Sequence, residues 1–192
     1  MAELEALRAK IMKCQLCRLC ETATRAVPGE GNPDADILFI GEAPGKKEDE
    51  TGEPFVGAAG KFLNELLASI NLERKDIFIT NIVKHRPPGN RDPKDDEIEQ
   101  CFPYLDQQIQ AIQPLLIVTL GRHAMNRFMP GLQISKVHGQ AKRVKSIFSK
   151  KQVIYPLYHP ASALYNGGMR PVLFEDMKKI PILLQKLRKG EL

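Results

Sequence analysis

The stretch Ile77-Phe-Ile-Thr-Asn-Ile-Val-Lys-His-Arg-Pro-Pro-Gly-Asn-Arg91 joins a short apolar run to a basic loop that two prolines stiffen. The run from Ile77 to Thr80 predicts a buried strand, and Asn81 stands where that strand ends. A carboxamide offers one acceptor and two donors, so Asn81 can pair with the amide edge of a ligand. A strand-end asparagine also often satisfies the backbone of the next loop, and Asn81 alone does not decide between the two roles.

Three further apolar runs predict strands, at Asp36 to Ile40, Leu115 to Leu120 and Gln152 to Leu157. Amphipathic stretches between and around them predict helices. The predicted helices span 2–12, 58–70, 95–112, 122–128 and 171–189, and Pro103 breaks the regularity of the third. The segment Val144 to Ile147 alternates well enough for one more short strand. The β-α-β-α-β order predicts an α/β fold, a three-layer α/β/α sandwich around a mostly parallel four-stranded sheet.

The segments that leave these strands carry the remaining polar signals. Gly41-Glu-Ala-Pro-Gly45 and Gly52-Glu-Pro-Phe-Val-Gly57 follow the first strand, and Tyr158-His-Pro-Ala161 follows the last. Because an open α/β sheet gathers its ligand at the carboxyl ends of its strands, one pocket can draw on all of them. Phe55 is then a stacking platform for a ring or ordinary core filler. His159 is a donor to an anionic oxygen or a loop cap.

Length and charge limit the class of protein. The chain has 192 residues, which suits a single domain over 1–192, and its net charge of +5 is compatible with a polyanionic partner. Basic side chains flank the two prolines of the 77–91 stretch: Lys84, Arg86, Arg91 and Lys94. No stretch near the start resembles a signal peptide, and the apolar run at Leu115 is far too short to span a bilayer. We therefore expect a cytoplasmic protein with no membrane partner.

The four cysteines predict a metal centre. Three lie in Cys14-Gln-Leu-Cys17-Arg-Leu-Cys20, and the fourth is Cys101. A reducing compartment disfavours disulfides, and thiols repeated every three residues are more typical of iron–sulfur proteins than of zinc sites. His85 competes with Cys20 for the last ligand position. The simpler alternative is that Cys101 is a buried helix residue and His85 an ordinary loop residue.

Taken together, these segments resemble the iron–sulfur uracil-DNA glycosylases, family 4 of the uracil-DNA glycosylase superfamily. The resemblance runs from Cys14 to about Asn166, and its motifs are the glycine-rich segments at 41–45 and 51–57, the stretch 80–91 and the segment 158–161. It implies excision of uracil from DNA by hydrolysis of the N-glycosidic bond, which leaves an abasic site. It also implies a [4Fe-4S] cluster beside the DNA-binding face, with the N-terminal cysteines and residues 85–101 forming a cluster lobe.

The family pattern assigns the pocket residues. The backbone from Gly41 to Ala43 lines the O2 side of uracil, and Glu42 sits against C5, where thymine carries a methyl group. Phe55 stacks on the base, and His159 stabilises negative charge on O2. Asn81 pairs with N3–H and O4 of uracil, whereas cytosine presents a lone pair and an amine in the same places.

The same pattern assigns the cluster ligands to Cys14, Cys17, position 85 and Cys101. Position 85 is usually cysteine in the family and is His85 in this chain. We expect His85 to be the fourth ligand. The alternative, Cys20, would take three ligands from a seven-residue stretch and leave the loop at position 85 unanchored.

The family pattern is less specific about which residues activate the water and which help to extract the base. Where the related family 1 has an aspartate, this chain has Ala43, so no carboxylate stands there to activate water. A dissociative reaction needs little activation, because stabilising the uracil anion lowers most of the barrier. Glu48 is the candidate that positions the water, and Asn81 is the second candidate. The wedge that fills the gap left by the base lies in the loop after His159, with Leu164 or Tyr165 entering the DNA.

We therefore expect a monomeric, monofunctional uracil-DNA glycosylase whose partner is uracil-containing DNA. Two alternatives stay open. One is a glycosylase with broader specificity for deaminated bases such as hypoxanthine. The other is a non-catalytic Cys/His metal module that binds nucleic acid, for which the segment 41–45 and His159 would have no use.

Overall fold

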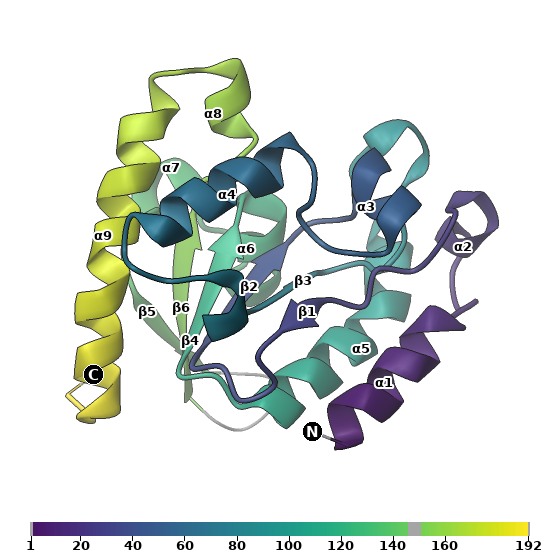
Figure 1. Cartoon of the computed structure of the whole chain (residues 1–192), viewed down its shortest axis with the longest axis horizontal. Helices are drawn as coiled ribbons and strands as arrows, with labels where there is room; N and C mark the ends of the chain where they lie inside the picture. Colours follow the sequence, from purple (N-terminus) through teal and green to yellow (C-terminus); the bar gives the residue numbers. More distant parts are fainter. Residues whose placement is uncertain (1, 146–150, 192) are drawn as a thin grey trace.

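The computed structural model describes residues 2–145 and 151–191, and within these residues one sheet has the strand order β1-β3-β2-β4-β6-β5 (Figure 1). The four strands in the middle of the sheet run parallel. They are β3 (Phe78–Asn81), β2 (Ile37–Gly41), β4 (Leu116–Leu120) and β6 (Lys151–Leu157). Two antiparallel strands close the edges, β1 (Glu30–Gly31) and β5 (Lys142–Lys145). The carboxyl ends of the parallel strands therefore lie along one edge of the sheet.

Two helices cover one face of the sheet, α4 (Ala58–Ala68) and α9 (Met169–Arg188). The core on this face includes Phe39 from β2, Leu66 from α4 and Met177 from α9, all of them fully buried. Successive side chains of a strand point to opposite faces, so Phe39 and its neighbours two residues away belong to this layer.

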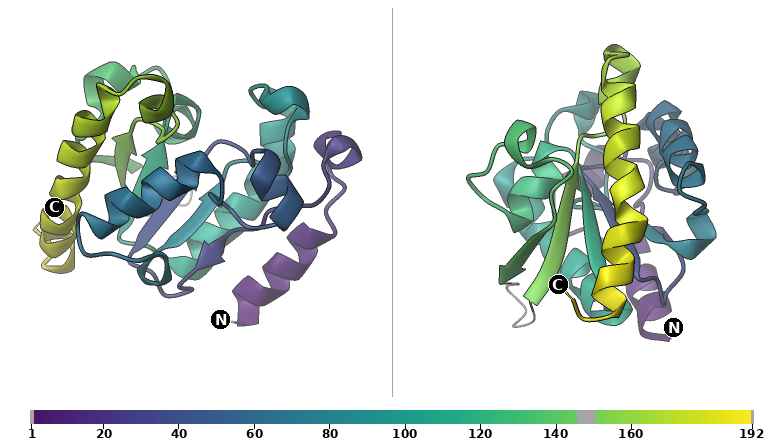
Figure 2. Two further views of the ribbon diagram at one scale, coloured as in Figure 1. Left: turned by 45° about the horizontal axis from the view of Figure 1, so that its top comes forward. Right: turned by 90° about the vertical axis from the view of Figure 1, so that its left-hand side faces the viewer.

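Three helices cover the opposite face, α5 (Asp95–Ile112), α6 (Arg122–Phe128) and α7 (Ile134–Val137). Leu38 from β2 and Leu105 from α5 lie in this second core. Figure 2 shows the resulting layers, with the sheet between two sets of helices. Because both faces are covered, the parallel strands are nearly continuous apolar runs.

Short elements surround this frame. The helix α1 (Ala2–Met12) lies against α5 and buries Leu7 and Ile11. The other short elements are α2 (Leu19–Thr22), α3 (Lys46–Thr51), α8 (Ser162–Tyr165) and the 3-10 turns η1 (Arg74–Asp76) and η2 (Pro88–Asn90). No helix in the described part of the chain is long and apolar enough to cross a membrane.

The predicted three-layer α/β/α arrangement with four parallel strands is confirmed, but the predicted number of strands is wrong. The edge strands β1 and β5 extend the sheet. β1 has two residues, too few for the alternation that identifies a strand in a sequence. The strand predicted at Val144 to Ile147 instead begins at Lys142, and residues 146 and 147 lie outside the described residues.

α5 has the predicted bounds, and only the break in regularity expected at Pro103 is absent. The helix is continuous although proline removes the bond to the carbonyl of Glu99. Both ends are fixed, because Glu97 accepts the N–H of Lys94 at 2.8 Å and Gln113 closes the helix with a φ of 51°. These contacts and the buried apolar face outweigh the cost of an interior proline, about 3 kcal/mol.

Candidate active site

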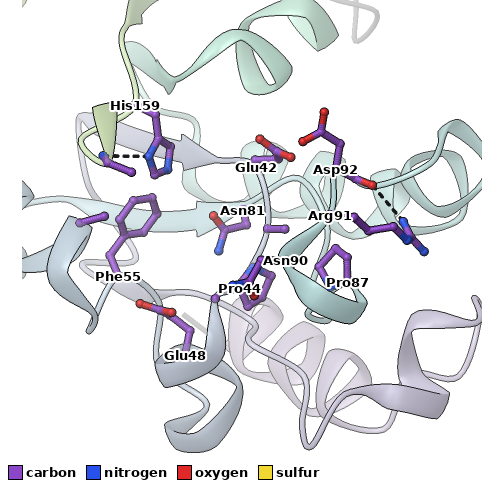
Figure 3. A pocket seen from close by; sticks show the side chains of 14 residues that line it. Glu42, Pro44, Glu48, Phe55, Asn81, Pro87, Asn90, Arg91, Asp92 and His159 are labelled. Atoms are coloured by element: carbon purple, nitrogen blue, oxygen red, sulfur yellow. Dashed lines mark hydrogen bonds between the residues drawn. The ribbon is translucent and has the colours of Figure 1, made fainter. Parts of the chain in front are cut away.

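The predicted site residues meet at one edge of the sheet. Gly41 ends β2 and Asn81 ends β3, and the two residues are paired in register. His159 follows the end of β6. These strand ends open on a cavity of about 320 Å³, shown in Figure 3. Its lining includes the predicted residues Glu42, Ala43, Glu48, Phe55, Asn81 and His159.

Asn81 lines this cavity and is only 1% exposed. Its Oδ1 is buried and has no hydrogen-bond partner among the described residues. Gly41 lies against it, since a Cβ built on Gly41 would stand 2.4 Å from Asn81 Oδ1 and 2.6 Å from Phe55 Cζ. Position 41 therefore requires glycine. A buried acceptor without a donor costs about 1–3 kcal/mol, which a ligand that supplies the donor would relieve.

Phe55 presents its ring to the cavity from a strained turn. Its φ of 53° lies in the left-handed region that bulky residues rarely adopt. Glu48 holds the turn, because its Oε1 accepts the N–H of Val56 at 2.9 Å and that of Gly57 at 2.8 Å. The rings of Phe55 and His159 are stacked, with centroids 5.8 Å apart and 27° between their planes. The exposed edge of this pair is suited to a flat ligand.

Arg74 holds the same turn from a distant part of the chain, and the sequence analysis missed it. Its Nη1 donates to the carbonyl oxygen of Phe55 at 3.1 Å, and its Nη2 donates to that of Pro54 at 2.5 Å. Its Nε donates to Glu30 Oε1 at 2.8 Å, which balances the charge. No motif around Arg74 marks this role, because the contact depends on how η1 folds back onto the loop before α4.

His159 is held as a neutral donor. Its Nδ1 accepts the N–H of Ala161 at 3.1 Å, so the proton of the neutral ring lies on Nε2. Burial lowers the pKa of His159 to about 4, and the nearby Glu48 carboxylate opposes that shift only in part. The ring therefore stays neutral at physiological pH and offers one N–H, from Nε2.

A charged group that the sequence analysis missed stands beside the cavity. Ligand atoms of Glu42, Asp92 and His123 lie within 4.8 Å of one another. Arg122 balances them, because its Nη2 donates to Asp92 Oδ2 at 3.2 Å and its Nε donates to His123 Nε2 at 2.9 Å. Burial raises the pKa of Glu42, and His123 opposes that shift. His123 stands just after β4, so the gathering of ligand sites at strand ends is the signal that points to it.

The proline-stiffened loop forms another wall of the cavity through Pro87, Asn90, Arg91 and Asp92. Arg91 does not extend into solvent. It donates to both carboxylate oxygens of Glu97, at 2.8 and 2.6 Å, and the Glu97 side chain is fully buried. This bidentate pair fastens the loop to α5, and the same bonds lower the pKa of Glu97.

Three cysteines form a group between the N-terminal segment and α5. Cys14 and Cys101 are buried, and Cys17 is partly buried. Burial raises the pKa of Cys101 to about 11; Lys84 opposes this shift, and the charges of Cys17 and Cys14 add to it. The N–H of Lys84 donates to Cys101 Sγ at 3.2 Å, and the side chain of Tyr104 hydrogen-bonds Cys14. The three predicted thiols therefore lie near enough to affect one another's ionisation.

The fourth predicted ligand, His85, is 5% exposed and follows Lys84 directly. Burial lowers the pKa of His85, which favours the neutral ring that a metal requires. Cys20, the alternative, is partly buried in α2, and its charge acts on Cys17.

The spacing of these five side chains tests which metal group they fit. No three of their ligand atoms lie within 4.8 Å of one another in the described structure. Two sulfurs on one zinc can be at most about 4.6 Å apart, because each Zn–S bond is about 2.3 Å long. The described side chains are thus not arranged as a closed single-ion site, and thiols with one imidazole are a donor set that suits an iron–sulfur cluster.

The predicted wedge residues lie on α8, which follows His159 after a short connection. Leu164 is 46% exposed and Tyr165 is 90% exposed. Leu16 and Ile182 are exposed to a similar degree, so this exposure places the two predicted wedge residues on the surface without assigning them a role.

Comparisons with known proteins agree with the geometry of the site. The family model described as Uracil DNA glycosylase superfamily matches residues 28–180. The Type-4 uracil-DNA glycosylase of Sulfurisphaera tokodaii is 50% identical over 186 residues, which cover 94% of this chain and 84% of the relative. The corresponding protein of Archaeoglobus fulgidus is 48% identical, with 97% and 96% covered. That of Thermotoga maritima is 38% identical, with 95% of each chain covered.

Proposed function

The chain belongs to the type-4 uracil-DNA glycosylases of the uracil DNA glycosylase superfamily, and from this premise we propose how its pocket excises uracil from DNA. The reaction hydrolyses the N-glycosidic bond between uracil and deoxyribose and leaves an abasic site. The observation that carries the assignment of the pocket is the buried, unpaired Oδ1 of Asn81.

Asn81 selects uracil by hydrogen bonding. The N3–H of uracil supplies the donor that Asn81 Oδ1 lacks, and O4 accepts from the amide nitrogen of the same side chain. Cytosine offers an acceptor and an amine at those positions, so both contacts become unfavourable. Glu42, which lines the cavity, is placed next to C5, where thymine carries a methyl group, and the glycine at position 41 leaves space for the side chains of Asn81 and Phe55.

In the chemical step, uracil leaves as an anion that the pocket stabilises. As the C1′–N1 bond breaks, its electron pair moves onto the base, and negative charge collects on O2. The Nε2–H of neutral His159 donates to that oxygen, and Phe55 holds the ring flat beside it. A donor that acts mainly in the transition state lowers the barrier to the chemical step rather than improving substrate binding.

Water then attacks C1′ from the opposite face, and the proton that it loses neutralises the released uracil anion by way of the solvent. Glu48 lines the cavity, and its Oε1 already accepts two backbone N–H groups. Its Oε2 is the oxygen left to hold the water, and Asn81 is the other candidate for this role. The same carboxylate thus organises the Phe55 turn and positions the nucleophile.

An iron–sulfur cluster fits the thiol group described above. Cys14, Cys17, Cys101 and His85 would hold a [4Fe-4S] cluster, and residues 85–101 with the N-terminal cysteines would form the cluster lobe of a single domain over 1–192. When bound, the cluster would cross-link these segments and could carry one electron, and the glycosidic bond needs neither an electron nor a Lewis acid. The burial of His85 and its position next to the Cys101 contact support it over Cys20.

The DNA must lie over the cavity with the uracil turned out of the helix. Extraction costs a few kcal/mol of stacking, which phosphate contacts and a wedge must offset. Leu164 and Tyr165 on α8 supply the wedge. All proposed pocket residues come from one chain, so a monomer is sufficient.

The direct test uses matched oligonucleotides that carry uracil, thymine, cytosine or hypoxanthine at one position, as single strands and as duplexes. We expect abasic sites, revealed by alkaline cleavage, with uracil alone. Release of hypoxanthine at a comparable rate would establish the broader specificity instead. DNA binding without release of any base would support a non-catalytic metal module.

A further inference from the structure

Lys84 is fully buried, although it carries an ammonium group. Its Nζ donates to three oxygens, the Thr80 hydroxyl at 2.8 Å, the Asn81 carbonyl at 2.8 Å and Gln108 Oε1 at 2.7 Å. All three acceptors are neutral, and in the described part of the chain no carboxylate forms an ion pair with this lysine. The Cys101 thiol is the ionisable group that acts on this lysine. A buried ammonium without a carboxylate is expensive, and an apolar side chain of similar length would fill the space at lower cost.

The acceptors around Lys84 belong to separate segments that meet under the cavity. Thr80 and Asn81 end β3, and Gln108 lies on α5. Gln108 also donates to the carbonyl oxygen of Pro28 at 2.6 Å, and the Thr80 hydroxyl lies 3.2 Å from the same oxygen. The ammonium therefore joins the end of β3 to α5, and Gln108 and Thr80 connect this junction to the segment before β1.

The backbone of Lys84 strengthens this junction. Its carbonyl accepts the N–H of Val27 at 2.7 Å, and its own N–H donates to Cys101 Sγ at 3.2 Å. The two residues between Asn81 and Lys84 continue the pairing with β2, since the N–H groups of Ile82 and Val83 donate to the carbonyls of Gly41 and Glu42. The Asn81 carbonyl is left for Lys84, and no other described residue donates to it.

We propose that Lys84 is a positioning residue for the glycosylase reaction: its buried ammonium fixes the peptide of Asn81 and thereby aims the Asn81 carboxamide at the base. This inference rests on the proposed role of Asn81 in the pocket. Its Oδ1 accepts no hydrogen bond from the described residues, so the carboxamide is held only by packing, as against Gly41, and by its own backbone. Its direction therefore depends on the backbone that Lys84 holds.

A double-mutant cycle tests the proposal. Lys84→Met keeps the length of the side chain and removes the charge, and Lys61→Met on the exposed face of α4 is the matched control. In single-turnover assays on a uracil oligonucleotide, we expect Lys84→Met to slow excision by roughly 10²-fold, the scale of a misplaced catalytic group. DNA affinity and the control variant should keep wild-type values.

The double variant Lys84→Met/Asn81→Ala distinguishes an effect that acts through Asn81 from a general loss of structure. We expect the double variant to match Asn81→Ala alone within roughly twofold, the scatter of independent sites. The proposal would be overturned if the rate losses of the two single variants multiplied in the double variant. It would also be overturned if Lys84→Met kept the wild-type rate.

Two smaller substitutions keep the test valid if Lys84→Met does not fold. Thr80→Val and Gln108→Leu each remove one acceptor of the ammonium, and each should slow excision less than Lys84→Met while remaining non-additive with Asn81→Ala. Thr119→Val on β4 is their control, because Thr119 is equally buried and its hydroxyl has no partner among the described residues. Equal losses for Thr119→Val would mark a general packing effect and overturn the proposal.

Amide hydrogen exchange gives a readout that does not need activity. Peptides that cover residues 78–86 should exchange faster in Lys84→Met, or in Gln108→Leu, and at the wild-type rate in Lys61→Met. If the wild-type protein leaves uracil in DNA, the proposed function fails, and the exchange rates still decide whether Lys84 holds the end of β3. Unchanged exchange in both acceptor and lysine variants would refute that clamp.

Discussion

The proposed discrimination between bases rests on one side chain, Asn81, whose Oδ1 is buried and has no partner among the described residues. Asn81→Asp replaces the donor that faces O4 by an acceptor and adds negative charge beside a departing anion. We expect uracil excision to be nearly abolished, since a good bidentate pair is worth ~1–3 kcal/mol of discrimination before the added repulsion. Single-turnover excision on uracil and cytosine oligonucleotides measures the effect, with the exposed Asn126→Asp as control. Retention of more than about a tenth of the wild-type rate would remove Asn81 from the uracil edge.

His159 acts on the transition state if its Nε2–H meets O2. We expect His159→Ala to lower the chemical rate roughly 10²–10³-fold, with little change in DNA affinity. Single-turnover rates and equilibrium binding to uracil-containing DNA measure the two quantities separately. Equal losses in rate and affinity would mark His159 as a residue that shapes its loop.

At the scale of elements, the turn that carries Phe55 depends on Arg74 at the other end of α4. Arg74→Met removes the donors to the Pro54 and Phe55 carbonyls while keeping the side-chain length. A left-handed φ costs of order 1–3 kcal/mol and persists only where the surroundings enforce it, so we expect the turn to relax and excision to fall roughly tenfold. The neighbouring Lys75→Met, also on η1, is the control in single-turnover assays. Wild-type activity in Arg74→Met would show that Glu48 alone holds the turn.

The loop after β3 and the start of α5 should be joined by the proposed cluster. Purified protein should be brown, and the colour should persist in Cys20→Ser and be lost or become labile in His85→Ala. A neutral imidazole in place of a thiolate makes the cluster one charge more positive, so we also expect His85→Cys to lower the reduction potential. Visible absorption, iron content and redox titration measure these effects. Colour kept in His85→Ala and lost in Cys20→Ser would reverse the ligand assignment, and stoichiometric zinc without iron would refute the cluster.

The long elements could be predicted from the sequence because each carries a periodic apolar pattern. The four parallel strands, α4, α5 and α9 all follow from such patterns, with small differences at their ends. The short elements could not, because β1 and α8 are too short to show a period and form through contacts with distant residues.

The residues of the site also fall into two groups, those that the sequence predicts and those that it does not. Asn81, Phe55 and His159 are found by their positions after strands and by a family resemblance. Arg74 binds the Phe55 carbonyl and Lys84 binds Gln108 on α5, so their roles depend on contacts between distant segments that no local pattern encodes. Pro103 shows the converse, a strong local signal that the packing of α5 overrides.

At the scale of the whole molecule, the partly buried His159 links stability to pH. Its pKa is about 4 in the folded protein and near its ordinary 6.5 in the unfolded chain. Between those values the unfolded chain takes up a proton that the folded protein refuses, so the free energy of unfolding should fall as the pH drops from 6.5 toward 4. Above pH 6.5 this contribution is complete and constant.

Denaturant unfolding of the wild type and of His159→Gln at pH 7.5 and pH 4.5 tests this linkage. The loss of stability on acidification should be smaller in the variant, because glutamine takes up no proton. An equal loss in both proteins would show that other groups account for the acid sensitivity.

The short connection from His159 to α8 has a mechanical consequence for the proposed enzyme. The proposed wedge side chains and the proposed donor to the departing base are carried by one continuous segment, a few residues apart, that follows the end of β6. They cannot advance independently. The protein would therefore inspect a base by the act of removing it from the helix, and a base that is only half extracted would find the donor still out of reach.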